Sequence, residues 1–365
     1  MGCRLLYLVG QLHTGGLERQ LYYLLQSMDR ERYEPVVATW NYAEEDFHLP
    51  PIRALGIPIY SLAGYSSAFD KFRAFRRLAQ QLRPQVVHSY SFYTNIAAAW
   101  ATWGTQATAL GSVRNDFTSE KKDAGLWLGR LSARWPRAQI CNSYAAAETC
   151  RYSQSAFIPK YLHVVQNGLD LERFRLFPFS TSAPVSLLGV GYLLPAKRWD
   201  RLLVAARELK HQGLSFAVRI AGDGPLRTAL EQQARTLGVA DCVTFLGHVD
   251  DVARLLAETT FVVHTADNEG CPNAVMEAMA CGRAVVSTDA GDVPFLVDDG
   301  TTGFVVHRSD SMKLVERLAT LMSNRDLCGR MGGAGRLKAE QEFGLDRFVE
   351  RTFAAYQAAG WLGLC

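Results

Sequence analysis

The sequence predicts an α/β protein with two domains, each built on a doubly wound parallel sheet. Short apolar runs alternate with amphipathic helical stretches along both halves of the chain, which is the pattern of parallel sheets covered by helices. The length of 365 residues is too great for one ordinary core and suits two domains. Residues 176–184 carry two prolines and no helical periodicity, so we place the linker there. The predicted domains are residues 1–178 and 183–344.

The first half contains extended apolar runs with helical patterns between most of them. Each run is short and rich in β-branched or aromatic residues, as buried parallel strands are. The predicted strands lie near residues 3–9, 35–40, 56–60, 85–89, 107–112, 138–142 and 162–166.

The second half repeats the arrangement and then ends in helices from about 309 to 360. Its predicted strands lie near residues 185–191, 216–221, 242–246, 260–265, 284–288 and 303–306. The sequence therefore indicates a second Rossmann-like sheet.

Residues 267–282 are the most informative segment of the chain. Pro272 suits a helix start and Gly282 a helix end, and residues 274–281 between them are apolar except for Glu277. A helix N-terminus offers unpaired N–H groups to a phosphate, and a carboxylate one turn further can accept two ribose hydroxyls. Glu269, on the preceding loop, is placed to meet a sugar. The alternative is a buried helix in which Glu277 pairs with an arginine.

This segment resembles the Glu-x7-Glu signature of the retaining glycosyltransferases of family 4, which have the GT-B fold, and the resemblance spans most of the chain. It implies that Glu269 contacts donor-sugar hydroxyls and that Glu277 contacts the ribose. It also implies a cleft between the two domains and a C-terminal helix, about 345–365, that packs back on the first domain. The backbone expected to meet the sugar and diphosphate belongs to Gly270, Cys271, Pro272, Asn273, Ala274 and Val275.

The turn from Gly191 to Asp200 follows a predicted strand and opens a helix, so it belongs to the ligand-facing edge of the second sheet. Family members usually place an arginine and a lysine here to clamp the donor diphosphate. Lys197 matches the lysine, whereas Tyr192 stands where the arginine is expected. Loss of one preorganised donor can cost about 3 kcal/mol of transition-state stabilisation, and Arg198 is the nearest replacement. The alternative for Lys197 and Arg198 is a solvated helix start.

Two further turns in the second half resemble family elements. Gly222 and Gly224 permit a tight turn after residues 216–220, although any strand-to-helix turn could use them. The resemblance places the backbone of Leu246 and Gly247 against the nucleobase. We favour a UDP-linked donor over a GDP-linked one, although backbone contacts leave little trace of the base in the sequence.

The first half is predicted to bind the acceptor. Gly15 and Gly16 would let backbone N–H groups approach the acceptor and the donor phosphates, or they form a plain turn. Arg114 and Asn115 follow a strand at the same edge of the sheet as His88. Arg114 suits an anionic acceptor or replaces the cation missing at Tyr192, while a lone histidine at a strand end is more often structural.

Charge is uneven along the chain. Residues 71–137 carry most of the basic excess, mixed with Phe72, Phe75, Trp127, Leu128, Leu131 and Trp135 at roughly helical spacing. Such helices can lie on anionic lipid, or they are ordinary amphipathic helices with a solvated basic face. The overall excess of +3 and the lack of a recognition motif argue against nucleic-acid binding.

Other features of the sequence exclude several classes of protein. No apolar run approaches the ~18 residues of a membrane span, and the first residues lack the layout of a signal peptide, so we expect a cytoplasmic protein, with contact to the inner face of the cytoplasmic membrane. The cysteines form no Cys-x-x-Cys pair, which argues against a zinc site or a disulfide framework. We expect no metal and no cofactor beyond the nucleotide-sugar.

Together these features predict a retaining hexosyltransferase that moves a sugar from a nucleotide-sugar to a glycan or lipid-linked acceptor, in bacterial exopolysaccharide, lipopolysaccharide or glycolipid synthesis. We assign catalytic roles to Lys197, Glu269 and Arg114. Two alternatives stay open: a nucleotide-sugar-binding protein that Tyr192 has made weak or inactive, and a sugar-nucleotide epimerase. The sequence does not identify the donor sugar, the acceptor, the linkage or the oligomeric state.

Overall fold

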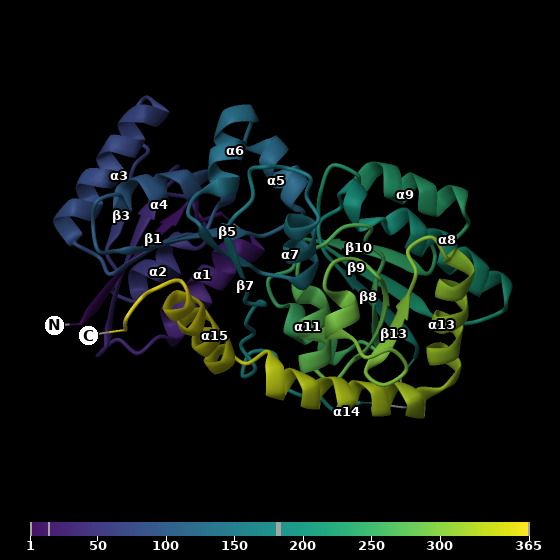
Figure 1. Ribbon diagram of the computed structural model, residues 1–365. Coiled ribbons are helices and arrows are strands. Elements are labelled where there is room, and N and C mark those ends of the chain that lie inside the picture. Colours follow the sequence, from purple (N-terminus) through teal and green to yellow (C-terminus); the bar gives the residue numbers. More distant parts are fainter. Residues whose placement is uncertain (1, 14, 180–183, 364–365) are drawn as a thin grey trace. The chain divides into compact units, whose positions relative to one another are not determined.

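A computed structural model describes residues 2–13, 15–179 and 184–363, which fall into two compact units (Figure 1). The first unit comprises Met1–Gly168 and Leu345–Cys365, and the second comprises Leu169–Gly344. The first unit thus ends at Gly168 and not at the predicted residue 178.

The difference at the boundary has a local cause. Leu169 N–H donates to the Phe343 carbonyl at 2.7 Å, and Phe174 is buried in the core of the second unit. Residues 169–179 are therefore already part of that unit. Residues 180–183 of the predicted linker lie outside the described residues.

The first unit contains a sheet of parallel strands in the order β3-β2-β1-β4-β5-β6-β7. Its strands lie within a few residues of the predicted runs, because short apolar β-branched segments suit strands buried on both faces. They are β1 (Cys3–Val9), β2 (Tyr33–Thr39), β3 (Ile59–Ser61), β4 (Val86–Ser89), β5 (Thr108–Val113), β6 (Ala138–Cys141) and β7 (Tyr161–Val164).

The first unit also contains the helices that connect these strands and one C-terminal helix. They are α1 (Gly16–Ser27), α2 (Leu49–Ala54), α3 (Ala68–Leu82), η1 (Phe92–Thr94), α4 (Asn95–Thr102), α5 (Phe117–Asp123), α6 (Leu126–Arg134), α7 (Tyr144–Arg151) and the C-terminal α15 (Leu345–Ala358).

The second unit contains a parallel sheet in the order β10-β9-β8-β11-β12-β13. Its strands are β8 (Ser186–Val190), β9 (Ala217–Ala221), β10 (Val243–Gly247), β11 (Phe261–His264), β12 (Ala284–Thr288) and β13 (Gly303–Val306). Its helices are η2 (Pro195–Lys197), α8 (Trp199–His211), α9 (Arg227–Thr236), α10 (Val252–Ala257), α11 (Asn273–Ala280), α12 (Val293–Leu296), α13 (Ser311–Ser323) and α14 (Arg325–Glu342). The prediction of two doubly wound parallel sheets is confirmed.

Helix α15 belongs to the first unit and lies beside α1 (Figure 1). The Phe353 ring stacks on Tyr33 with centroids 4.3 Å apart, and the Trp361 indole N–H donates to Gln85 Oε1 at 2.9 Å. Gly168 is held against this helix, because a Cβ added there would lie 2.7 Å from Phe348. Residues 364–365 of the predicted C-terminal helix lie outside the described residues.

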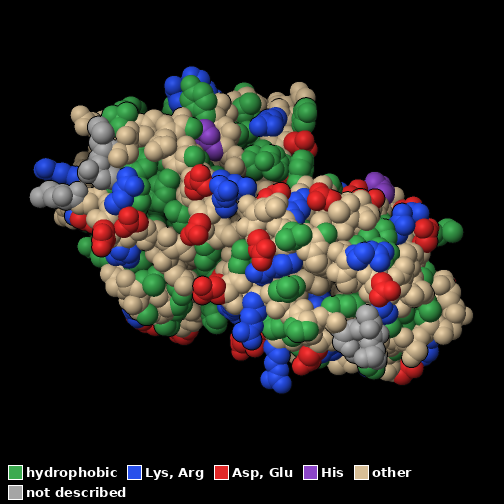
Figure 2. Space-filling model, turned by 90° about the horizontal axis from the view of Figure 1, so that it is seen from below, with side chains coloured by type: hydrophobic (Ala, Val, Ile, Leu, Met, Phe, Trp, Pro, Cys, Tyr) green, Lys and Arg blue, Asp and Glu red, His purple; other side chains and the backbone are tan. Residues whose placement is uncertain are grey.

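Three further observations concern the surface, the lengths of the apolar helices and the cysteines. On the face drawn in Figure 2, acidic, basic and apolar side chains are interspersed, and within the described residues no helix is long and apolar enough to cross a membrane. Among the described cysteines, Cys3 is disulfide-bonded, and the free thiols are Cys141, Cys150, Cys242, Cys271, Cys281 and Cys328.

Tyr356→Phe should destabilise the first unit. The Tyr356 hydroxyl lies 2.8 Å from His88 Nδ1 and is buried, and an unpaired buried polar group costs about 1–3 kcal/mol. We expect the unfolding temperature to fall by a few degrees in a thermal scan. Tyr152→Phe makes the same chemical change at an exposed site and should leave the temperature unchanged; equal behaviour of the two variants would contradict the prediction.

Candidate active site

The loop after β11 and the start of α11 form the centre of the site in the second unit. The β-branched run of β11 is buried along its length, and Pro272 stands at the N-cap of α11 because its fixed φ and missing N–H are tolerated there. Gly282 adopts a φ of +70° just after the helix, which only glycine does readily. Glu277 is buried within α11. The predicted start and end of this helix are confirmed to within one residue.

Glu269 is a buried carboxylate held between two basic side chains. Its side chain is 13% exposed, and its Oε1 accepts from the Lys197 ammonium and lies 3.0 Å from His264 Nε2. Burial opposes ionisation, but the hydrogen bond from His264 and the charge of Lys197 outweigh it and lower the pKa of Glu269 to about 2. The carboxylate is therefore ionised at neutral pH.

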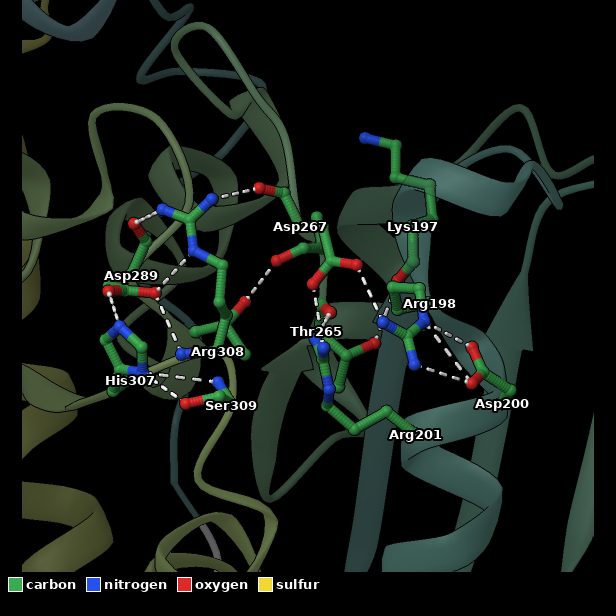
Figure 3. Close-up of polar contacts among 12 residues, drawn as sticks. Lys197, Arg198, Asp200, Arg201, Thr265, Asp267, Asp289, His307, Arg308 and Ser309 are labelled. Carbon is green, nitrogen blue, oxygen red and sulfur yellow. Dashed lines mark hydrogen bonds and ion pairs between the residues drawn. The ribbon is translucent and has the colours of Figure 1, made fainter.

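Arginines attach the loop that carries Glu269 to its neighbours (Figure 3). Arg201 donates to the Thr265 carbonyl at 2.6 Å and to Asp267 Oδ1 at 2.7 Å. Arg308, beyond β13, donates to the Asp267 carbonyl and to Asp289 Oδ1. The loop is thus tied to α8 on one side and to the end of β13 on the other.

Arg198 is part of the same support. Its guanidinium donates to Asp267 Oδ2 at 2.7 Å and to Asp200 at 3.0 Å, and the hydrogen bonds to Asp200 and Asp267 raise its pKa. Figure 3 shows Lys197 pointing away from these ion pairs. Lys197 and Arg198 are thus each paired with a carboxylate and are not simply solvated, and the replacement of the missing arginine by Arg198 stays a prediction.

Tyr192 and the nearby glycines form closely packed turns at the edge of the second sheet. Tyr192 is 51% exposed, and its carbonyl accepts from the Trp199 indole at 3.0 Å. Gly222 has a φ of +147°, and a Cβ there would lie 2.0 Å from the Gly191 carbonyl oxygen. Gly224 is similar, since its Cβ would lie 2.8 Å from the Leu193 carbonyl oxygen. The turns approach each other so closely at these two positions that a residue with a Cβ atom would not fit.

The turn at the end of β10 lies against the turn that carries Gly222. Gly222 N–H donates to the Gly247 carbonyl at 2.7 Å, so the β10 end that carries Leu246 and Gly247 lies against the turn after β9. The predicted donor-binding turns are therefore adjacent, and their contact with a nucleotide stays a prediction.

In the first unit, His88 and Arg114 meet at the ends of β4 and β5. The His88 ring is buried, with Nδ1 2.8 Å from the Tyr356 hydroxyl and Nε2 3.1 Å from Ser112 Oγ. Burial, together with the Arg114 charge, holds the pKa of His88 well below its ordinary value. Contact between His88 and an acceptor would require one of these hydrogen bonds to break.

Arg114 and Asn115 are positioned through their backbone. Both N–H groups donate to Glu120 Oε1, at 2.8 and 2.9 Å, and burial raises the pKa of Glu120 to about 7 although these donors oppose it. The Arg114 guanidinium lies 4.6 Å from the centre of the Tyr90 ring. Arg114 is thus a buried cation stacked on an aromatic face.

Gly15 is the N-cap of α1, and Gly16 is its first residue. A Cβ added at Gly15 would lie 2.2 Å from Glu18 Oε2, so a larger residue would displace that carboxylate. Burial raises the pKa of Glu18. Both predicted glycines therefore lie where the loop enters the helix.

Comparisons with known proteins agree with this fold. Residues 14–173 match the family model "Glycosyltransferase Family 4" and residues 184–324 match "Glycosyl transferases group 1". HepE of Anabaena, whose crystal structure is in complex with UDP, superposes with a TM-score of 0.82 over 97% of this chain and 100% of that chain at 19% identity. The lipopolysaccharide outer core galactosyltransferase WaaB superposes with a TM-score of 0.78 over 97% and 99% at 15% identity.

A curated relative extends the comparison at the level of sequence. The putative colanic acid biosynthesis glycosyltransferase WcaL of Escherichia coli is 33% identical over 203 residues, which are 53% of this chain and 50% of WcaL. The match thus spans about half the length of that relative.

The two parallel sheets define a protein of the GT-B fold. The chain belongs to the family 4 glycosyltransferases, also described as glycosyl transferases group 1.

Sequence reasoning missed His264, Arg201, Asp267 and Arg308. Their residue types are ordinary for a strand end or a helix surface, and their partners lie up to 69 residues away along the chain. Only the adjacency of β8, β11, β12 and β13 brings them together, so no local pattern signals them.

Glu269→Gln should destabilise the second unit in a pH-dependent way. A folded pKa of about 2, below the ordinary 4.5, means that ionisation of Glu269 stabilises the protein fully above pH 4.5 and that this contribution is lost as the pH falls toward 2. It is on the order of 3 kcal/mol. The difference in unfolding temperature between wild type and variant should therefore shrink as the pH falls through this window, whereas Glu350→Gln, at an exposed ion pair, should show no such trend. A difference that stays constant with pH would contradict the prediction.

Proposed function

We propose that this protein transfers a sugar, with retention, from a UDP-sugar to a glycan or lipid-linked acceptor in bacterial exopolysaccharide, lipopolysaccharide or glycolipid synthesis. Membership of family 4 supports sugar transfer. The names of WcaL and WaaB refer to colanic acid and to lipopolysaccharide, and the complex of HepE with UDP supports a uridine donor over a guanosine donor.

The observation that carries the proposal is the half-buried ion pair between Lys197 and ionised Glu269, and Glu269 lies a few residues before the N-terminus of α11. Sugar transfer breaks the anomeric C–O bond while negative charge grows on the departing diphosphate. We assign Lys197 and the backbone of residues 270–275, in which every residue except Pro272 carries an N–H group, to that charge. We assign Glu269 to the donor-sugar hydroxyls and Glu277 to the ribose.

We assign the acceptor to the first unit. Arg114 is a cation whose position is set by Tyr90 and Glu120, which suits an anionic acceptor such as a lipid-linked phosphate. Gly15, Gly16, Asn115 and His88 complete the proposed acceptor set. Because a preorganised cation needs little rearrangement, Arg114 is the member that we expect to matter most.

A second candidate function follows from Tyr192. The arginine expected there is missing, and Arg198 is engaged with two aspartates. A protein that binds a nucleotide-sugar without transferring it would fit these two observations. Hydrolysis of the donor separates the candidates, because an inactive binder releases no free sugar.

Helix α6 is the part of the basic region that we propose to contact an anionic membrane. In α3, Phe75 and Leu78 are buried, as in an ordinary amphipathic helix, and Phe69 in its first turn is exposed. In α6, by contrast, Leu126, Trp127 and Leu131 are exposed, and Arg130 and Arg134 lie on the same short helix. Exposed aromatic and basic side chains together suit the membrane interface.

Nucleotide binding and turnover test the donor assignment. UDP and UDP-sugars should raise the unfolding temperature more than GDP or ADP compounds do, and the best UDP-sugar should be slowly hydrolysed. Glu277→Ala should abolish the shift, because the ribose would lose its carboxylate partner. EDTA should leave hydrolysis unchanged, because we propose that transfer needs no divalent cation.

Glu316→Ala, at an exposed ion pair of α13, is the control and should bind UDP as wild type does. An unchanged shift in Glu277→Ala would show that the site assignment is wrong. A shift without hydrolysis would favour the inactive binding protein, and a shift by no nucleotide would refute the proposal.

Membrane contact is tested with vesicles. Wild-type protein should float with vesicles of phosphatidylglycerol and phosphatidylcholine but not with phosphatidylcholine alone. Trp127→Ala should reduce flotation severalfold, because the exposed indole would no longer enter the interface. Trp103→Ala, at an equally exposed tryptophan after α4, should float as wild type does. Equal flotation of both variants would exclude α6 as the contact.

A further inference from the structure

His264 lies between a serine and the carboxylate of Glu269. It ends β11 and stands in register with Ser287 on the neighbouring strand β12. Its side chain is 3% exposed. His264 Nδ1 lies 3.0 Å from Ser287 Oγ, and His264 Nε2 lies 3.0 Å from Glu269 Oε1. Both ring nitrogens are therefore engaged with oxygens.

The hydroxyl of Ser287 indicates which atom donates to the other. Ser287 Oγ donates to the Thr288 carbonyl at 2.9 Å. A hydroxyl carries one hydrogen and two lone pairs, so while Ser287 Oγ donates to the Thr288 carbonyl it accepts from His264, and Nδ1 of His264 then carries a hydrogen. A neutral His264 would need the Ser287 hydrogen turned away from that carbonyl and toward Nδ1.

The carboxylate of Glu269 indicates in a similar way whether the second ring nitrogen of His264, Nε2, carries a hydrogen. Glu269 Oε1 accepts from the Lys197 ammonium, which has no lone pair and can only donate. An ionised carboxylate has no hydrogen to offer, so Nε2 of His264 must donate to it. An imidazole that donates from both nitrogens is an imidazolium.

The charges around His264 make its second ring proton important. The positive charge of Lys197 and the negative charge of Glu269 cancel one another. The nearby arginines are matched one for one by carboxylates, since Arg198, Arg201 and Arg308 pair with Asp200, Asp267 and Asp289. His307 also faces Asp289 at 3.7 Å. With a neutral His264 this group of side chains would have no positive surplus for a departing diphosphate.

We propose that His264 is a positioning residue held as an imidazolium, and that its charge, acting through Glu269, replaces the cation that Tyr192 removes from the donor site. The proposal rests on the proposed donor site. Because two cations share one carboxylate, the Lys197–Glu269–His264 group keeps a net positive charge where the diphosphate charge is proposed to grow. The proton count on His264, however, can be measured without any substrate.

The protonation state is tested by NMR on the full chain labelled with ¹⁵N-histidine. Long-range ¹H–¹⁵N correlations at about pH 7 should show both His264 nitrogens protonated. The His264 signals are assigned as those that disappear in the His264→Gln variant. If that variant does not fold, they are assigned as the signals that shift in Ser287→Ala. One unprotonated nitrogen would overturn the proposal.

The role of the charge is tested by donor hydrolysis. Glutamine at position 264 can still donate to Glu269 but carries no charge, so His264→Gln should lower kcat by about a hundredfold while KM for the donor stays within a fewfold. His211→Gln, at an exposed histidine that ends α8, should retain wild-type kinetics. Wild-type kcat in His264→Gln would overturn the proposal. Two protonated nitrogens in a wild-type protein that hydrolyses no nucleotide-sugar would support the imidazolium and refute the proposed function instead.

Discussion

The carboxylate of Glu269 is the group on which the arrangement of the second unit depends. A buried charge is costly unless basic partners and hydrogen bonds compensate for lost hydration, and Glu269 has Lys197 on one side and His264 on the other. These partners come from different elements, so the loop between β11 and α11 must be held in one place. Arg201 and Arg308 hold it by donating to its carbonyl groups.

The same requirement explains how the cations of this region are used. A guanidinium next to a partly buried aspartate gains strong charge-assisted hydrogen bonds, and Arg198 accordingly binds Asp200 and Asp267. Arg198, the predicted replacement for the cation missing at Tyr192, is therefore engaged with these two aspartates. The proposed imidazolium of His264 is a replacement from the interior of the sheet.

The first unit uses aromatic packing for a similar purpose. Tyr356 of α15 reaches His88 at the end of β4, and Tyr90 lies under the Arg114 guanidinium. The C-terminal helix thereby supports the strand ends that carry the proposed acceptor residues. A cation on an aromatic face is held in place by the ring quadrupole, and at Arg114 this contact adds to the charge interactions with Glu120 and Glu18.

The sequence by itself determined the positions of the strands and helices, because apolar periodicity, Pro272 and Gly282 act over a few residues. It also marked Lys197, Glu269 and Glu277 through a motif of local spacing. Only the tertiary structure decided that Arg198 supports a loop, that His264 faces Ser287, that α6 exposes Leu126, Trp127 and Leu131, and that the first segment of the first unit ends at Gly168. These outcomes depend on which strands and helices become neighbours, and that order is set by packing over the whole domain.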